Sequence, residues 1–201
     1  VEIWLIEIIP TDKIISFYKE GFFPMAENAT SHEINFFKPK KRFIIPIDNF
    51  HIPKKLFNEF KKKKYTYSIN KNFSSVVNQC AKPRIKDSET WINKIIQETY
   101  NQLFINGFAK SIECFYENKL IAGLYGVHIG SCFFGESMFS NISNTSKFCL
   151  LLLISILKEN NFKLLDSQFY NPHLLQFGAF EILDDEYQLI LKKEINKKSN
   201  F

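Results

Sequence analysis

The 201-residue chain has few of the residues that build metal and disulfide sites. It contains four cysteines and four histidines, and Cys80, Cys114, Cys132 and Cys149 form neither a Cys-x-x-Cys pair nor a Cys/His cluster. This spacing argues against a zinc site or a disulfide framework. We therefore expect four reduced and mostly buried thiols in a cytosolic protein that holds no metal.

Long apolar runs are also missing. The longest, Phe148 to Leu157, is interrupted by Ser155 and is far shorter than the roughly 18 apolar residues of a membrane span, so it predicts a buried helix. Val1 to Trp4 has no basic segment ahead of an apolar one, and no secretory signal is expected there. We expect no membrane partner.

Glycine and proline number only seven each. The sequence contains no glycine-rich phosphate-binding loop, no recognisable nucleophile triad and no metal-ligand spacing. A reaction catalysed by this chain should therefore depend on positioning and electrostatics, act on an already activated substrate and need no cofactor.

Basic residues are concentrated in one region of the chain. Residues 35–71 hold eleven Lys or Arg and two acids, Asp48 and Glu59, a local balance of +9 within a total of +5. Such a segment suits a polyanionic partner, although a solvated lysine-rich face is an equal alternative on charge alone.

The first half of the chain predicts short elements. We expect a helix over Ile14–Tyr18 stopped by Gly21, and a loop over Phe22–Ala26. Arg42–Ile47 predicts a strand, placed at a sheet edge by Pro46. The remaining elements are a basic helix over Pro53–Lys64, a strand over Tyr65–Ile69 and a short helix over Phe73–Cys80.

The second half predicts a mixed sheet with helices. A helix through Trp91 and Phe104, capped by Asp87 or Ser88 and ended by Gly107, comes first. An antiparallel meander follows, over Phe108–Tyr116, Leu120–Ile129 and Ser131–Phe139. After it we expect a buried helix over Thr145–Lys158 capped by Asn144, a strand over Lys163–Phe169, a short helix between Pro172 and Gly178, an extended segment over Ala179–Ile182 and a last strand over Tyr187–Leu191.

This order predicts the α+β class. A small basic N-terminal α/β domain over residues 1–85 precedes an acetyltransferase-like (GNAT) mixed-sheet domain over residues 86–201, with a soft boundary near Lys82–Ser88. The order of elements is weak evidence for this fold when taken alone.

Three polar or aromatic features are unusual in their surroundings. On a strand, Asp166 and Gln168 share one face and Ser167 the other, which places a carboxylate and an amide among apolar residues. Glu136 follows Gly135 between aromatic residues. Taken alone, the first pair is as well explained by a structural network, and Glu136 by an exposed bulge. Trp91 either packs between the two halves or stacks on a base.

Together these segments resemble the leucyl/phenylalanyl-tRNA–protein transferases. The similarity runs from about Tyr18 to Leu191 and includes Phe22 to Glu27. Its most specific motifs are Gly135-Glu136-Ser137-Met138-Phe139, Asn144-Thr145-Ser146-Lys147 and Asp166-Ser167-Gln168, joined by Cys80 to Arg84, Thr90-Trp91-Ile92, Gly123 to Gly126 and Phe177-Gly178-Ala179.

The resemblance implies a reaction. Members of this family move Leu or Phe, sometimes Met, from aminoacyl-tRNA to the N-terminal Arg or Lys of an acceptor protein, which marks that protein for degradation. It implies a cytoplasmic enzyme, which we expect to be a monomer. The family fold, a small N-terminal domain plus an acetyltransferase-like domain, agrees with the element order.

The resemblance also implies residue roles. Trp91 stacks on the terminal adenosine, Glu136 contacts the donor near its amino group or ribose, and Asp166 with Gln168 holds and activates the acceptor. The donor side chain lies in an apolar pocket made by Leu124, Phe133, Met138, Leu150, Leu153, Leu157 and Leu165. We expect the tRNA phosphates to meet Lys38, Lys40, Lys41, Arg42, Lys61, Lys62, Lys63 and Lys64.

The step expected at this site is attack of a neutral amine on the tRNA ester. Asp166 orients the amine and assists proton loss through Gln168, as a general base or only as a positioning group. Two alternatives stay open: another acyltransferase of this fold, using acyl-CoA or a different aminoacyl-tRNA, and a non-catalytic tRNA-binding module. Residues 140–147 lack the glycine-rich turn that acyl-CoA favours, and intact Glu136, Asp166 and Gln168 argue against a non-catalytic module.

Overall fold

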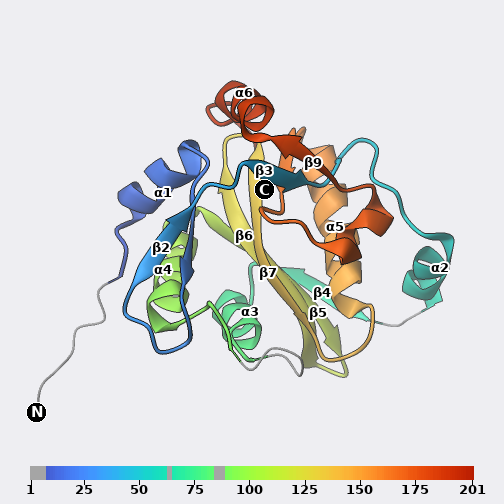
Figure 1. The fold of residues 1–201 in the computed structure, drawn as a ribbon. Coiled ribbons are helices and arrows are strands. Elements are labelled where there is room, and N and C mark those ends of the chain that lie inside the picture. The colour runs from blue at the N-terminus through green and yellow to red at the C-terminus, as the bar shows by residue number, and fades with distance from the viewer. Residues whose placement is uncertain (1–7, 63–64, 84–88) are drawn as a thin grey trace, which may run out of the picture.

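The computed structural model describes residues 8–62, 65–83 and 89–201. The predicted helix caps Asp87 and Ser88, the lysines Lys63 and Lys64, and the segment Val1–Trp4 lie outside these ranges. The architecture is mixed α+β, with helices packed around one large sheet (Figure 1).

The sheet has seven strands in the order β4-β5-β6-β7-β8-β3-β9. Its parallel contact joins β7 to β8, and the neighbouring strands otherwise pair antiparallel. The predicted meander is confirmed as β5-β6-β7. The strands are β3 (Lys41–Ile44), β4 (Thr66–Ile69), β5 (Ala109–Tyr116), β6 (Lys119–Ile129), β7 (Cys132–Ser140), β8 (Leu164–Asp166) and β9 (Phe180–Leu183).

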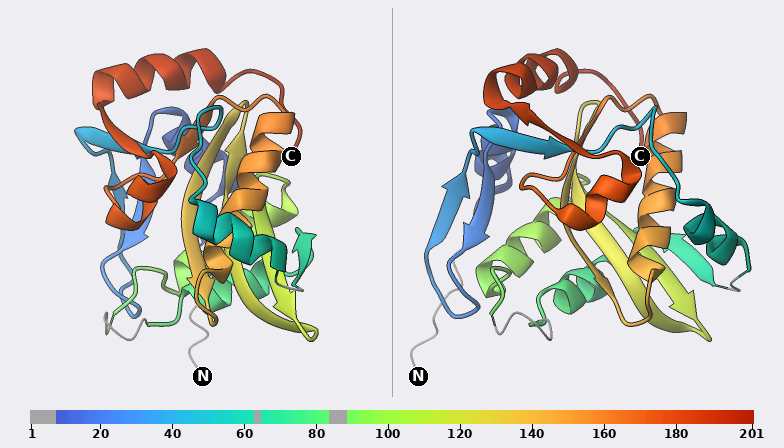
Figure 2. Two further views of the ribbon diagram at one scale, coloured as in Figure 1. Left: turned by 90° about the vertical axis from the view of Figure 1, so that its right-hand side faces the viewer. Right: turned by 45° about the vertical axis from the view of Figure 1, so that its right-hand side comes forward.

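The helices cover both faces of this sheet (Figures 1 and 2). On one face, α1 (Thr11–Lys19), α3 (Phe73–Cys80) and α4 (Lys94–Ile105) bury residues such as Val76 and Tyr100 against Tyr125 and Phe134. On the other face, α5 (Thr145–Glu159) buries Leu150 and Leu153. Burial of both faces explains why β6 is apolar along nearly its whole length rather than alternating.

Five more elements lie around this frame. The strands β1 (Phe23–Ala26) and β2 (Ile34–Phe37) form a separate antiparallel ribbon beside α1 and α4 (Figure 1). The basic helix α2 (Lys54–Lys62) lies at the opposite flank, next to α5. The chain then adds the 3₁₀ turn η1 (Pro172–Phe177) and the C-terminal helix α6 (Asp184–Glu194).

Several elements differ from the sequence prediction in the first half. Residues 23–26 form β1 instead of a loop, because they pair with a strand whose register the local pattern does not reveal. The strand β3 lies between β8 and β9 rather than at an edge. Pro46 is tolerated because β3 ends at Ile44, so its missing N–H removes no bond of the ladder.

Two helix starts in the second half also differ from the prediction. Asn93 caps α4, since its Oδ1 accepts a hydrogen bond from the Ile96 backbone N–H at 2.8 Å, and Trp91 precedes the helix. Asn144 precedes α5 but makes no side-chain cap; it adopts a left-handed conformation, and its Nδ2 donates to Glu59 Oε2 of α2.

The predicted last strand is wrong, since residues 187–191 belong to α6. Tyr187 and Leu191 are both buried and lie four residues apart, which is a helical spacing that the strand prediction overlooked. The acidic residues Asp184, Asp185 and Glu186 occupy the first turn, where the helix dipole favours negative charge.

Strands from both sides of residue 85 share the large sheet, since β4 pairs with β5 and β3 pairs with β8 and β9. The division into domains 1–85 and 86–201 stays a prediction. The four cysteines are buried, as predicted. In the described ranges, no helix combines the length and apolarity needed to cross a membrane.

Candidate active site

A cavity of about 1080 Å³ opens where two central strands separate. β7 and β8 run side by side only from Cys132↔Leu164 to Phe134↔Asp166. β8 ends at Asp166, and the following residues bond to β3, with the Ser167 N–H donating to the Phe43 carbonyl at 2.9 Å. β7 continues to Ser140 paired with β6 on its other side, so the cavity forms between the edge that β8 leaves and the departing chain.

One wall of the cavity is apolar. Six of the seven residues predicted to hold the donor side chain line it, namely Leu124, Phe133, Met138, Leu150, Leu153 and Leu165, and Trp91, predicted to stack on the terminal adenosine, lines the same cavity. Leu157 is fully buried and is not among the lining residues, so its predicted contact with the donor is wrong for this cavity. Ile45, Leu174 and Phe177 also line the cavity, although they were not predicted as pocket residues.

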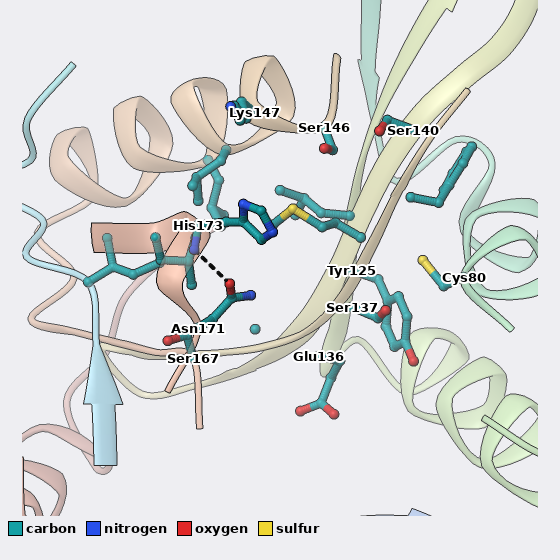
Figure 3. A pocket seen from close by; sticks show the side chains of 18 of the residues that line it. Cys80, Tyr125, Glu136, Ser137, Ser140, Ser146, Lys147, Ser167, Asn171 and His173 are labelled. Atoms are coloured by element: carbon teal, nitrogen blue, oxygen red, sulfur yellow. Dashed lines mark hydrogen bonds between the residues drawn. The ribbon is translucent and has the colours of Figure 1, made fainter. Parts of the chain in front are cut away.

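The cavity also has a polar rim. It includes Ser146 and Lys147 near the start of α5, and Asn171 and His173, which lie below them in Figure 3. The Asn171 Oδ1 accepts a hydrogen bond from the His173 backbone N–H at 3.0 Å, which fixes the start of η1. This rim offers hydrogen-bonding groups and a cation to a polar part of a substrate.

Asp166 is paired with a residue for which the sequence predicted a different task. Arg42 donates from Nη2 to Asp166 Oδ2 at 2.6 Å and from Nε to both carboxylate oxygens, and neither side chain has exposed surface. The Tyr187 hydroxyl donates to Oδ2 at 2.8 Å. Arg42 Nη1 also donates to the Gly21 carbonyl at 2.8 Å. The Asp166 carboxylate is thus the centre of a buried ion pair.

Glu136 is the centre of a second polar cluster. Its Oε1 accepts from the Tyr18 hydroxyl at 2.7 Å and from Gln168 Nε2 at 2.9 Å, and its Oε2 accepts from the Tyr100 hydroxyl at 2.7 Å. Burial raises the pKa of Glu136 to about 7, although the hydrogen bonds from Tyr100 and Tyr18 lower it. Burial also raises the pKa of both tyrosines.

Gln168 joins the two clusters. Its side chain reaches Glu136, and its backbone N–H donates to Asp166 Oδ1 at 2.8 Å. Asp166 and Gln168 therefore meet in one network, but the predicted reason, alternation along a strand, is wrong. β8 ends at Asp166, and Gln168 has a left-handed φ of 67°, a strained conformation for this residue type.

Comparisons with known proteins identify the family of this chain. A model of the leucyl/phenylalanyl-tRNA protein transferase family matches residues 44–192. The chain belongs to this family of aminoacyltransferases. It is 41% identical over 183 residues to the leucyl/phenylalanyl-tRNA–protein transferase of Zymomonas mobilis, covering 91% of this chain and 68% of that protein. The Hyphomonas neptunium protein of the same name is 40% identical over 190 residues, covering 94% and 74%.

Among solved structures, L-PGS from Bacillus licheniformis is similar at a TM-score of 0.46 and 11% identity. The match covers 94% of this chain and 72% of that one.

The basic residues predicted to meet tRNA lie in more than one place in the part of the chain that the structure describes. Arg42 is fully buried on Asp166, so its predicted contact with tRNA phosphates is wrong. Lys38 and Lys41 are partly neutralised by Asp184 and Glu181. Lys40 is exposed near them, whereas the exposed Lys61 and Lys62 end α2 at the opposite flank (Figure 1). The predicted role of these lysines stays a prediction.

Three tyrosines of the network, Tyr18, Tyr100 and Tyr187, had no predicted role in the site, and Arg42 had a different one. All three tyrosines occupy the buried side of a helix, where a sequence pattern treats them as core residues. The available signal was chemical, because a buried hydroxyl needs a hydrogen-bond partner. Two cations that line the cavity, Lys82 and Lys147, belong to the family motifs but had no predicted role in binding.

Proposed function

We propose that the chain transfers Leu, Phe or Met from aminoacyl-tRNA to the N-terminal Arg or Lys of acceptor proteins, which marks those proteins for degradation. The observation that carries this proposal is the apolar cavity at the split between β7 and β8, bordered by Glu136 and Asp166 in a chain of this family. Aminoacyl-tRNA is made in the cytoplasm, so we place the reaction there, with the chain acting as a monomer.

The cavity wall supports an apolar donor side chain. Leu124, Leu150, Leu153 and Met138 line it. Burying a Leu or Phe side chain contributes about 1.5–3 kcal/mol, whereas a polar side chain would lose its hydration there. Trp91 lies on the same cavity, where it would stack on the terminal adenosine of the donor.

The chemistry requires no activation beyond the ester itself. The aminoacyl ester of tRNA is already reactive, and an α-amine with a pKa of about 8 keeps a usable neutral fraction near neutral pH. The site then has to place the amine against the ester carbonyl.

We propose the acetyltransferase-like (GNAT) arrangement for the sheet domain. A parallel pair of strands that separates beside the acyl group is the feature that supports it, and β7 with β8 has this form. In this arrangement, residues 1–85 form the small N-terminal domain and contribute β3 and Arg42 to the site. The exposed Lys40, Lys61 and Lys62, with Lys38 and Lys41, would approach the phosphates of the acceptor stem.

The proposed function is tested by a transfer assay. Purified protein is incubated with radiolabelled Leu-tRNA or Phe-tRNA and a peptide that begins with Arg or Lys. We expect label in both peptides and none in matched peptides that begin with Glu or carry an acetylated N-terminus. Label in neither the Arg nor the Lys peptide, with both donors, would reject the proposal.

A further inference from the structure

The Asp166 carboxylate is fully occupied by neighbouring donors. Oδ1 accepts from Arg42 Nε at 3.1 Å and from the Gln168 backbone N–H at 2.8 Å, while Oδ2 accepts from Arg42 Nη2 and from Tyr187. Its side chain has no exposed surface, although the residue borders the cavity. A proton on Asp166 would break a buried ion pair, so this carboxylate is suited to remain an anion throughout the reaction.

Glu136 differs from Asp166 in the charge of its partners. Its hydrogen-bond donors, Tyr18, Tyr100 and Gln168, are all neutral, so a proton on Glu136 breaks no ion pair with them. Glu136 lines the cavity and is 9% exposed. Figure 3 shows its carboxylate on the side of the cavity away from Lys147. Glu136 can thus take up a proton and give it back.

We propose that Glu136, rather than Asp166, accepts the proton that the acceptor amine loses, and that Arg42 and Tyr187 are positioning residues that hold Asp166. This inference rests on the proposed function. Asp166 in turn binds the Gln168 backbone N–H, which stabilises its left-handed turn and directs its amide to Glu136. Asp166 therefore fixes the position of Glu136 through Gln168, and the two carboxylates share no proton.

The proposed step forms a peptide bond and returns Glu136 to its starting state. The amine nitrogen bonds to the ester carbonyl carbon, and one amine proton passes to the Glu136 carboxylate. The bond between that carbon and the ribose oxygen of tRNA then breaks. Neutral Glu136 gives its proton to this oxygen, which leaves as a hydroxyl, and Glu136 returns to its carboxylate form.

The surroundings of Glu136 favour this exchange near neutral pH. Burial raises its pKa to about 7, which suits a general base that must also release its proton. The groups that act on it come from five elements. Tyr100 and Tyr18 lower its pKa by hydrogen bonding, Asp166 raises it, Arg42 lowers it, and Tyr125 of β6 faces it from the sheet.

The first experiment measures the pH dependence of single-turnover transfer to an Arg peptide in wild type and Tyr100→Phe. Loss of this hydroxyl removes a hydrogen bond to ionised Glu136, so the pH at which the rate begins to rise should move up by about one unit. The part of the pH–rate profile that follows ionisation of the acceptor amine should not shift. A profile that does not move would overturn the proposal.

Tyr187→Phe is the matched control, because it removes the equivalent hydroxyl from Asp166. For Tyr187→Phe we expect a lower rate, with no shift in the part of the pH–rate profile assigned to Glu136. Arg42→Lys should lower kcat more than it raises KM for the peptide. If the pH at which the rate begins to rise shifts in Tyr187→Phe but not in Tyr100→Phe, the proton would be assigned to Asp166. If Tyr100→Phe does not fold, Tyr18→Phe removes the other hydroxyl on Glu136 and has the same expected direction.

A measurement without substrate separates this inference from the proposed function. Infrared difference spectra of wild type against Glu136→Gln, recorded from pH 5 to 9, should show one carboxyl that ionises near pH 7 and is absent from the variant. Its absence from wild type would reject the role of Glu136 even if transfer occurs. Failure of the transfer assay with this carboxyl present would reject the proposed function alone.

Discussion

Arg42 and Asp166 lie 124 residues apart in the chain and form a fully buried ion pair, with Nη2 and Oδ2 at 2.6 Å. Arg42 also lies over the rings of Phe23 and Tyr187, with its guanidinium carbon 4.8 and 4.5 Å from their centroids. The pair joins β3 to β8 at the point where the cavity opens. It fixes one side of the site before any substrate is present.

Breaking this pair should destabilise the protein strongly. Arg42→Leu leaves Asp166 buried without its cation, which costs about 3–5 kcal/mol of unfolding free energy. Urea unfolding measured by circular dichroism gives the value. Lys41→Leu is the control, because Lys41 pairs with Glu181 at the surface and its loss should cost less than about 1 kcal/mol. Equal losses in the two variants would contradict the central role of the pair.

The stability of the protein should decrease as pH rises, because Glu136 ionises in the folded state. Its pKa is raised to about 7 in the folded state from an ordinary value of 4.5, so the folded protein binds more protons than the unfolded chain between these values. The free energy of unfolding therefore decreases as pH rises through this window, by about 3 kcal/mol in total.

The matched variant for this prediction is Glu136→Gln, which cannot ionise. The stability of wild type relative to Glu136→Gln should fall between pH 4.5 and 7 and then level off, in urea unfolding at each pH. A difference that stays constant across this range would show that Glu136 ionises normally in the folded state.

The cavity wall should set the preference between donors. Leu153→Ala enlarges the pocket, and we expect the ratio of kcat/KM for Phe-tRNA to that for Leu-tRNA to rise about tenfold, since a methylene or two in an apolar pocket contributes about 1–3 kcal/mol. Leu157→Ala on the same helix is the control. It lies outside the cavity, so it should cost about 2–5 kcal/mol of stability and leave the ratio unchanged.

The exposed lysines of α2 should contribute to tRNA binding through phosphates. Replacing Lys61 and Lys62 by Ala should weaken binding and make the plot of log affinity against log salt shallower by about one for each lysine that contacts a phosphate. Filter binding at several salt concentrations measures the slope. Lys192→Ala with Lys193→Ala, on α6, provides a charge-matched control. The same slope in wild type and the α2 variant would exclude Lys61 and Lys62 from the interface.

Elements with a clear local pattern could be predicted from the sequence. The β5-β6-β7 meander and helix α5 match their predicted ranges within one or two residues, because short connections favour hairpins and an apolar run favours a buried helix. The prediction failed at α6, where Tyr187 and Leu191 fit both a strand and a helix. It also failed for β1, whose strand state depends on pairing with β2.

The sequence by itself determined the family, the motifs and most of the apolar lining, because these follow from residue identity and order. Only the tertiary structure decided which polar groups meet. Arg42 belongs to a basic segment and was predicted at the surface, yet the fold buries it on Asp166. Gln168 reaches Glu136 because the chain leaves β8 in a left-handed turn. Buried charges and hydroxyls must be paired, and their partners come from distant strands and helices that only the folded chain brings together.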